Sequence, residues 1–144
     1  MIKIAIISNP KKLSSKLTQY FTGSPAYHIC FVDESIGKMW DMNLIFRRRV
    51  WPHYKPEYVT YYQCPVNLTA EDLEWWLDHD EDWYGVLDYS AFALKKLFTA
   101  FRPNFKGSIC SEKVAQILVK NGWLSPFYDT PSPADFEKVL TKIG

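Results

Sequence analysis

The sequence predicts an α+β fold in which a small antiparallel sheet packs against helices. Residues 2 to 63 contain short apolar or alternating runs, which are typical of strands. Segments with apolar residues at helical spacing follow in the second half of the chain. The turns between the strands are dense, which favours an antiparallel meander. The length of 144 residues fits a single domain, 1–144, with a sizeable core.

The first strand is predicted over residues 2–7, and Asn9-Pro10 ends it. Ser14 or Ser15 caps a short predicted helix that runs to Phe21. The turn at 22–25 then leads into a strand over 26–32. Alternation places His28, Cys30 and Val32 on one face of this strand and Tyr27, Ile29 and Phe31 on the other.

Residues 33–37 predict a hairpin connection that returns through a strand over 38–42. Further strands are predicted over 44–51 and 58–63. The first of these contains the dense basic run Arg47-Arg48-Arg49, in which Arg47 and Arg49 share one face and Arg48 takes the other. A solvated edge strand that resists aggregation is the favoured interpretation of this run, and an anion site is the alternative.

Helices are predicted next. Thr69 and Asp72 have the spacing of an N-terminal capping box. Residues 80–85 form an acidic, aromatic loop, and Asp88 begins a helix that ends before Gly107. The helix that contains Cys110 is predicted to start at Gly107-Ser108 and to stop at Asn121-Gly122. Ser132 and Pro133 start a last helix, whose predicted buried residues are Phe136, Val139, Leu140 and Ile143.

Composition excludes several classes of function. The net charge of +1 gives no electrostatic footprint for nucleic acid. The three cysteines have no spacing typical of zinc ligands or of a disulfide framework, so no metal and no cofactor is expected. The N-terminal apolar run is too short for a signal peptide or a membrane span, and a cytoplasmic protein without a membrane segment is predicted.

Cys110 is the candidate nucleophile. A thiol in the first turn of a helix is close to unpaired backbone N–H groups and to the positive end of the helix dipole, both of which favour the reactive thiolate. The backbone N–H of Cys110 is then a candidate oxyanion donor. Core packing is the alternative, because Cys110, Val114 and Ile117 lie on one helical stripe.

Thiol catalysis also needs an imidazole and a polar group that orients it. Among the three histidines, His28 is the best placed because a strand holds the ring rigidly, whereas His53 lies in a loop and His79 at an acidic helix end. Asp41 lies on the next strand, from which its carboxylate reaches the ring if the two residues are opposite or diagonal. Asn43 is the alternative on the same face.

Several motifs resemble a known family. The segment Thr22–His28 before an apolar strand, the helix Ile109–Ala115 with its Cys-Ser-Glu, and Gly37–Asp41 resemble the permuted, papain-like branch of the NlpC/P60 superfamily, which includes YiiX-like and lecithin:retinol-acyltransferase-like proteins. Histidine comes first and cysteine last in that branch, as here. Trp83-Tyr84-Gly85 resembles a further family segment. The resemblance spans residues 2 to 140 and implies a circularly permuted papain-like fold.

The resemblance implies a bacterial or phage cysteine peptidase, amidase or acyltransferase with the triad Cys110, His28 and Asp41. Asp41 stands where the family more often has His, Glu or Asn. Tyr27, Trp83 and Tyr84 are expected to contact the substrate, which is a peptide, an acyl group or a protein conjugate; both Trp83 and Tyr84 can instead be packing residues. The alternative function is a catalytically inactive binding or assembly module with the same fold. The sequence leaves the oligomeric state open.

Overall fold

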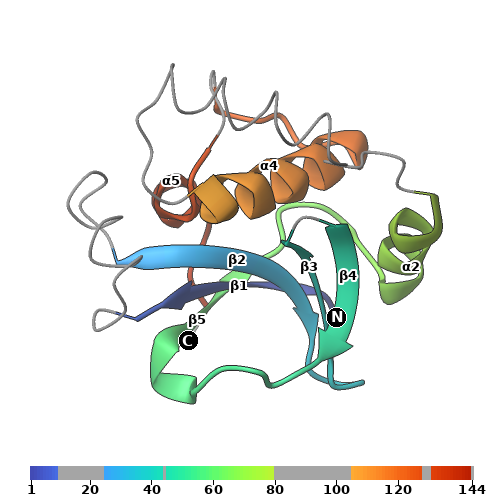
Figure 1. The fold of residues 1–144 in the computed structure, drawn as a ribbon. Helices are drawn as coiled ribbons and strands as arrows, with labels where there is room; N and C mark the ends of the chain where they lie inside the picture. Colours follow the sequence, from blue (N-terminus) through green and yellow to red (C-terminus); the bar gives the residue numbers. More distant parts are fainter. Residues whose placement is uncertain (10–24, 44, 80–104, 128–130, 144) are drawn as a thin grey trace.

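In a computed structural model, the protein has an α+β fold. Its described residues form a five-stranded antiparallel sheet with three helices packed against it (Figure 1). The structure describes residues 1–9, 25–43, 45–79, 105–127 and 131–143. The predicted helix after Ser14 or Ser15 and the predicted helix after Asp88 lie outside these residues. Among the described residues, no helix is both long and apolar enough to cross a membrane.

The sheet has the strand order β4-β3-β2-β1-β5. Its strands, whose bounds agree with the predictions to within about two residues, are β1 (Lys3–Ser8), β2 (Ala26–Asp33), β3 (Lys38–Asn43), β4 (Ile45–Val50) and β5 (Val59–Gln63). Consecutive strands from β1 to β4 are neighbours, so these four form the predicted meander. β5 instead returns to the free edge of β1, which makes β1 a central strand and explains its continuous apolar sequence.

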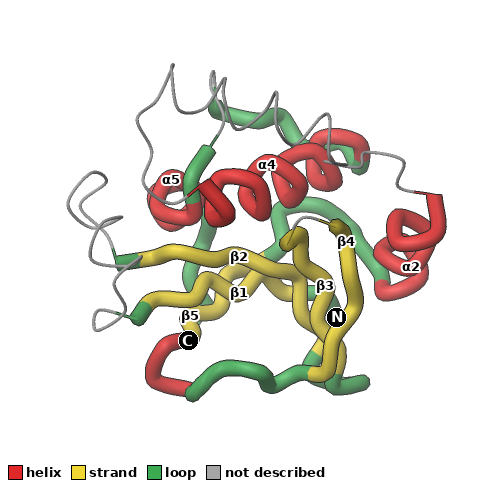
Figure 2. The backbone as a smooth tube through the Cα atoms, in the orientation of Figure 1, coloured by secondary structure: helices red, strands yellow, loops and turns green. Residues whose placement is uncertain are grey.

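The helices in the described part of the chain are α2 (Ala70–His79), α4 (Phe105–Lys120) and α5 (Pro133–Val139), and a short 3-10 helix, η1 (Pro56–Tyr58), precedes β5. Figure 2 shows α4 along one side of the sheet and the connection between β4 and β5 along the other. Each face of the sheet therefore has its own apolar cluster. The cluster on the helix side includes Phe31, Trp40, Cys110, Val114 and Ile117; the opposite cluster includes Cys30, Val32, Met39 and Trp51.

The predicted capping box at Thr69 and the predicted helix start at Ser132 are both confirmed. Thr69 Oγ1 accepts a hydrogen bond from the backbone N–H of Asp72 at 3.2 Å, and Asp72 Oδ2 accepts one from the backbone N–H of Thr69 at 3.0 Å. Ser132 and Asp135 make the same reciprocal pair at the start of α5. These boxes begin the two helices that flank α4 in the chain order of the described residues, and they satisfy backbone donors that would otherwise lack partners.

Two helix predictions need correction. α4 already includes Phe105, so it begins before the predicted start at Gly107-Ser108, although its end at Lys120 is as predicted. α5 ends at Val139, because the chain becomes extended at the next residue. Val139 was predicted to be buried, but it is 42% exposed. Ile143 donates its backbone N–H to the carbonyl of Tyr61 at 2.9 Å. The C-terminal residues therefore line the edge of β5 and do not extend the helix.

Candidate active site

His28 and Asp41 lie in direct contact, as the sequence predicts. His28 Nε2 is 2.8 Å from Asp41 Oδ2, and the Asp41 side chain is fully buried. Backbone pairing between β2 and β3 covers Phe31 to Asp33 of β2 only. If this register continued along the strands, Asp41 would lie opposite Cys30 and diagonal to His28, which is the geometry that lets the two side chains meet.

Cys110 reaches the same imidazole from α4. α4 packs against β2 and β3, and the Cys110 side chain is fully buried in the helix-side cluster. A hydrogen bond between Cys110 and His28, together with the charge of Cys110, contributes to the protonation behaviour of the ring. Three elements that are far apart in the sequence therefore bring the predicted nucleophile, base and orienting carboxylate together.

The position of Cys110 within α4 corrects one sequence prediction. Cys110 is the sixth residue of α4 counted from Phe105, not a first-turn residue. Only the first four N–H groups of a helix lack intrahelical acceptors. The backbone N–H of Cys110 is therefore part of the helical ladder, and it is not the oxyanion donor that an N-terminal position suggests. A contact with His28 is therefore the feature of this site that can activate the thiol, and the helix start is not.

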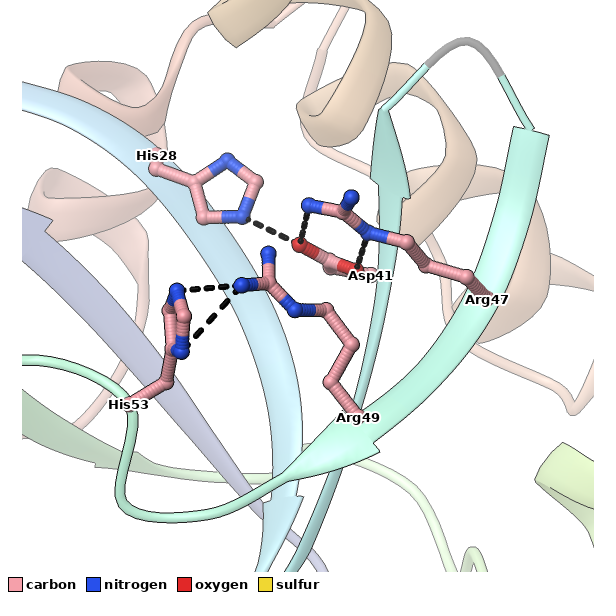
Figure 3. Close-up of polar contacts among 5 residues, drawn as sticks. All are labelled: His28, Asp41, Arg47, Arg49 and His53. Atoms are coloured by element: carbon pink, nitrogen blue, oxygen red, sulfur yellow. Dashed lines mark hydrogen bonds and ion pairs between the residues drawn. The ribbon is translucent and has the colours of Figure 1, made fainter.

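Arg47 is a partner of Asp41 that the sequence analysis did not assign. Its Nε donates to Asp41 Oδ1 at 2.8 Å and its Nη2 to Asp41 Oδ2 at 3.2 Å, which makes a bidentate pair (Figure 3). Asp41 and Arg47 are directly paired across β3 and β4. A bidentate guanidinium fixes the plane of a carboxylate, so Arg47 holds the Asp41 carboxylate in the orientation that receives His28.

The electrostatics of the site favour a protonated imidazole. Burial alone would lower the pKa of His28, but the charge of Cys110 and the hydrogen bonds of Asp41 and Cys110 outweigh burial and raise the pKa to about 9. Burial acts on Asp41 in the opposite sense, and the hydrogen bonds and charges of His28 and Arg47 outweigh it, lowering the pKa of Asp41 to about 2. At neutral pH the pair is therefore an imidazolium and a carboxylate.

Aromatic side chains lie close to His28. The ring of Tyr54 lies 6.2 Å from the His28 ring and 4.9 Å from the His53 ring. Burial raises the pKa of Tyr54, so its hydroxyl keeps its proton. Tyr27, which was predicted to contact substrate, packs against the apolar cluster next to this group. Trp51 completes the wall with a ring 6.3 Å from that of Tyr54.

Three of the other candidate residues lie where the structure does not describe their side chains. Trp83 and Tyr84 lie outside the described residues, and so does the side chain of Asn43, the alternative to Asp41. His79 stacks on Trp75 with ring centroids 4.5 Å apart at the end of α2, where it has a packing role. Within the described part of the chain, no group of three or more His, Cys, Asp or Glu residues is placed to hold a metal.

Comparison of the chain with protein families, with curated proteins and with solved structures finds no match.

The shifted pKa values of His28 and Asp41 predict how stability depends on pH. A raised histidine pKa stabilises the fold fully below about pH 6.5, and this contribution is lost as the pH rises through about 9. The contribution of Asp41 is present above about pH 4 and is lost as the pH falls through about 2. Urea unfolding is therefore expected to give its highest free energy between about pH 4 and 6.5 and a value about 3 kcal/mol lower at pH 9.5.

Cys30 contributes to the same decline, because burial raises its thiol pKa and so favours unfolding in alkaline solution. The His28→Gln variant separates the two contributions. It retains Cys30 and should lose less stability than the parent protein between pH 6 and 9.5. Equal losses in the two proteins would show that His28 has no raised pKa.

Proposed function

We propose that this protein is a cysteine hydrolase or acyltransferase of the circularly permuted papain-like type. The observation that supports this most strongly is the contact of a single imidazole, His28, with both a cysteine, Cys110, and a buried carboxylate, Asp41. A packed core cysteine needs no such partner, whereas a nucleophilic thiol needs both. The strand–strand–helix origin of the three residues, with histidine first and cysteine last, is consistent with the permuted arrangement.

The proposed reaction begins with a thiolate–imidazolium pair. Asp41 occupies Nε2 of His28, so Nδ1 is the ring nitrogen left to face Cys110. The Cys110 sulfur attacks the carbonyl carbon of an amide, ester or thioester, and the carbon–sulfur bond forms as the carbonyl electron pair moves to oxygen. His28 then gives its Nδ1 proton to the leaving group as the bond to that group breaks.

The second half of the reaction regenerates the enzyme. Water in a hydrolase, or another acceptor in an acyltransferase, attacks the thioester while neutral His28 takes up its proton. The carbon–sulfur bond breaks, and Cys110 leaves as a thiolate beside the imidazolium that has formed. Asp41 stabilises that imidazolium and keeps the ring oriented in both halves, as its contact at 2.8 Å suggests.

Burst kinetics with p-nitrophenyl acetate test this proposal. A nucleophilic Cys110 is expected to release about one p-nitrophenolate per chain before slower turnover, and intact mass spectrometry should find one acetyl group on Cys110. Cys110→Ala should remove both signals. Cys64→Ser is the matched control, because Cys64 is the one half-buried cysteine of the three and does not contact His28.

The same measurement distinguishes an enzyme from a binding module of the same fold. Acetylation that persists in Cys110→Ala, or that occurs at Cys64, would contradict the proposal. Absence of acetylation in the parent protein, with esters and thioesters alike, would favour the binding module.

A further inference from the structure

Arg49, next to the site, contacts a histidine ring and, in the described part of the chain, not a carboxylate. Arg49 Nη2 lies against both ring nitrogens of His53 and is 3.1 Å from Nδ1. An N–H donor can bond to an imidazole nitrogen only when that nitrogen is unprotonated. His53 is therefore neutral in this arrangement. Arg49 donates to a neutral acceptor, which does not compensate its positive charge.

The nearby carboxylate of Asp41 already has two other cationic partners. Among the described residues, Asp41 forms its ion pairs with His28 and Arg47, and no ion pair joins Arg49 to a carboxylate. Register explains why Arg49 nevertheless lies on the same face, because Arg47 pairs with Asp41 and Arg49 pairs with Met39, two residues earlier on β3. Alternate residues of a strand share a face.

The electrostatic environment of His53 links this arginine to the site. Burial and the charges of Arg49, Arg47 and His28 lower the pKa of His53, whereas the charge of Asp41 opposes them. Figure 3 shows the Arg49 guanidinium directed toward His28 and Asp41. With His28 protonated, this face holds three cationic side chains, His28, Arg47 and Arg49, around the Asp41 carboxylate.

We propose that Arg49 and His53 form an anion subsite that binds a carboxylate or phosphate group of the substrate beside Cys110 and His28. The substrate class is therefore an acyl compound with a negatively charged group near the bond that reacts. This assignment of a substrate rests on the proposed function, whereas the binding of the anion does not. A planar guanidinium offers two parallel N–H donors to two anionic oxygens, and the one ring N–H of neutral His53 can add a third donor.

NMR titration of the Arg49 Nε–H and His53 ring signals tests the subsite without requiring activity. The probes are inorganic phosphate, N-acetylglycine as a carboxylate, and N-acetylglycinamide as its neutral counterpart, all at constant ionic strength. Saturable shifts with phosphate or with N-acetylglycine, and none with the neutral amide, are expected. The stronger of the two anions identifies the group that the substrate carries.

Variants of adjacent arginines provide the control. Arg49→Gln is expected to weaken anion binding at least about tenfold, followed at His53. Arg49→Lys, which keeps the charge without the fork, should give an intermediate affinity. Arg48→Gln changes the net charge equally on the other face of β4, where Arg48 binds Glu74 of α2, and should leave binding unchanged.

Two results would overturn the subsite: shifts that increase linearly with every salt, or equal losses in Arg49→Gln and Arg48→Gln. Either result would leave the acetylation of Cys110 untouched. Conversely, saturable anion binding in a protein whose Cys110 is never acetylated would support the subsite and contradict the proposed hydrolase.

Discussion

The His28→Ala variant is expected to lose about 100-fold in the rate at which iodoacetamide alkylates Cys110 at pH 6 to 7. In the parent protein, the pKa of about 9 keeps His28 protonated in this range, and a neighbouring imidazolium favours the reactive thiolate. Alkylation of Cys110 in this range should therefore depend on the imidazole and should be slower in His28→Ala than in the parent protein.

Mass spectrometry of tryptic peptides assigns the alkylation to each cysteine separately. Cys64 is the internal reference, because burial raises its pKa, a backbone hydrogen bond of Val66 opposes this, and no histidine among the described residues contributes. Its rate should be the same in the parent and in His28→Ala. Equal alkylation rates of Cys110 in the two proteins would contradict a thiolate–imidazolium pair. The Cys110 side chain is fully buried, so its alkylation also tests whether a reagent can reach the sulfur. Complete resistance of Cys110 to iodoacetamide in the folded protein would contradict its role as a nucleophile.

Local signals in the sequence predicted the helix starts that depend on a few adjacent residues. The capping box at Thr69 and the helix start at Ser132 formed as expected, because each requires only a side chain and a backbone group three residues apart. The predicted start of α4 was wrong because it was also based on a few adjacent residues. Gly107 and Ser108 have the composition of a turn, but both are tolerated inside a helix when tertiary packing favours it.

The candidate site was predictable in so far as it depends on one hairpin. Residues 33–37 connect adjacent strands, and this alone brings His28 and Asp41 within reach of each other. Arg47 was missed because its contact with Asp41 requires the register of the next hairpin, β3 with β4. Strand alternation places Arg47 and Arg49 on one face, but it does not pair that face with Asp41.

Contacts between distant parts of the chain carried the least signal. β5 pairs with β1 across the whole meander, and the apolar run of β1 indicates burial without naming a partner. The edge position of β4 was expected, yet Arg47 and Arg48 both form ion pairs with carboxylates there. The favoured interpretation of the arginines as a solvated edge is therefore incomplete, because it assigned them no specific partners.

Replacing Asp41 with alanine is expected to lower the free energy of unfolding by about 3 kcal/mol at pH 6. The Asp41 side chain has 0% exposure and receives charged donors from both His28 and Arg47. Its removal leaves the buried imidazolium without a carboxylate. The pKa of His28 should then decrease by about one unit or more, because burial favours the neutral ring.

Glu74→Ala is the matched control for Asp41→Ala. Glu74 also accepts an arginine, Arg48 at 2.7 Å, but its side chain is 32% exposed. Water can solvate Arg48 after the substitution, but the buried indole of Trp40 loses an acceptor 3.3 Å from its Nε1, so the expected cost is about 1 to 2 kcal/mol. Urea unfolding at pH 6 measures both variants, and NMR titration of the His28 ring follows its pKa in each.

Equal costs for the two variants would mean that Asp41 acts only as an ordinary salt-bridge partner. A large cost at Asp41 combined with an unchanged His28 pKa would assign Asp41 to Arg47 and to the fold. The expected combination is a large cost in the free energy of unfolding with a lowered His28 pKa. It would mean that one carboxylate both stabilises the fold and keeps His28 protonated. The contact that keeps the imidazole protonated for Cys110 is then the same contact that holds β2 beside β3 where their backbone pairing ends.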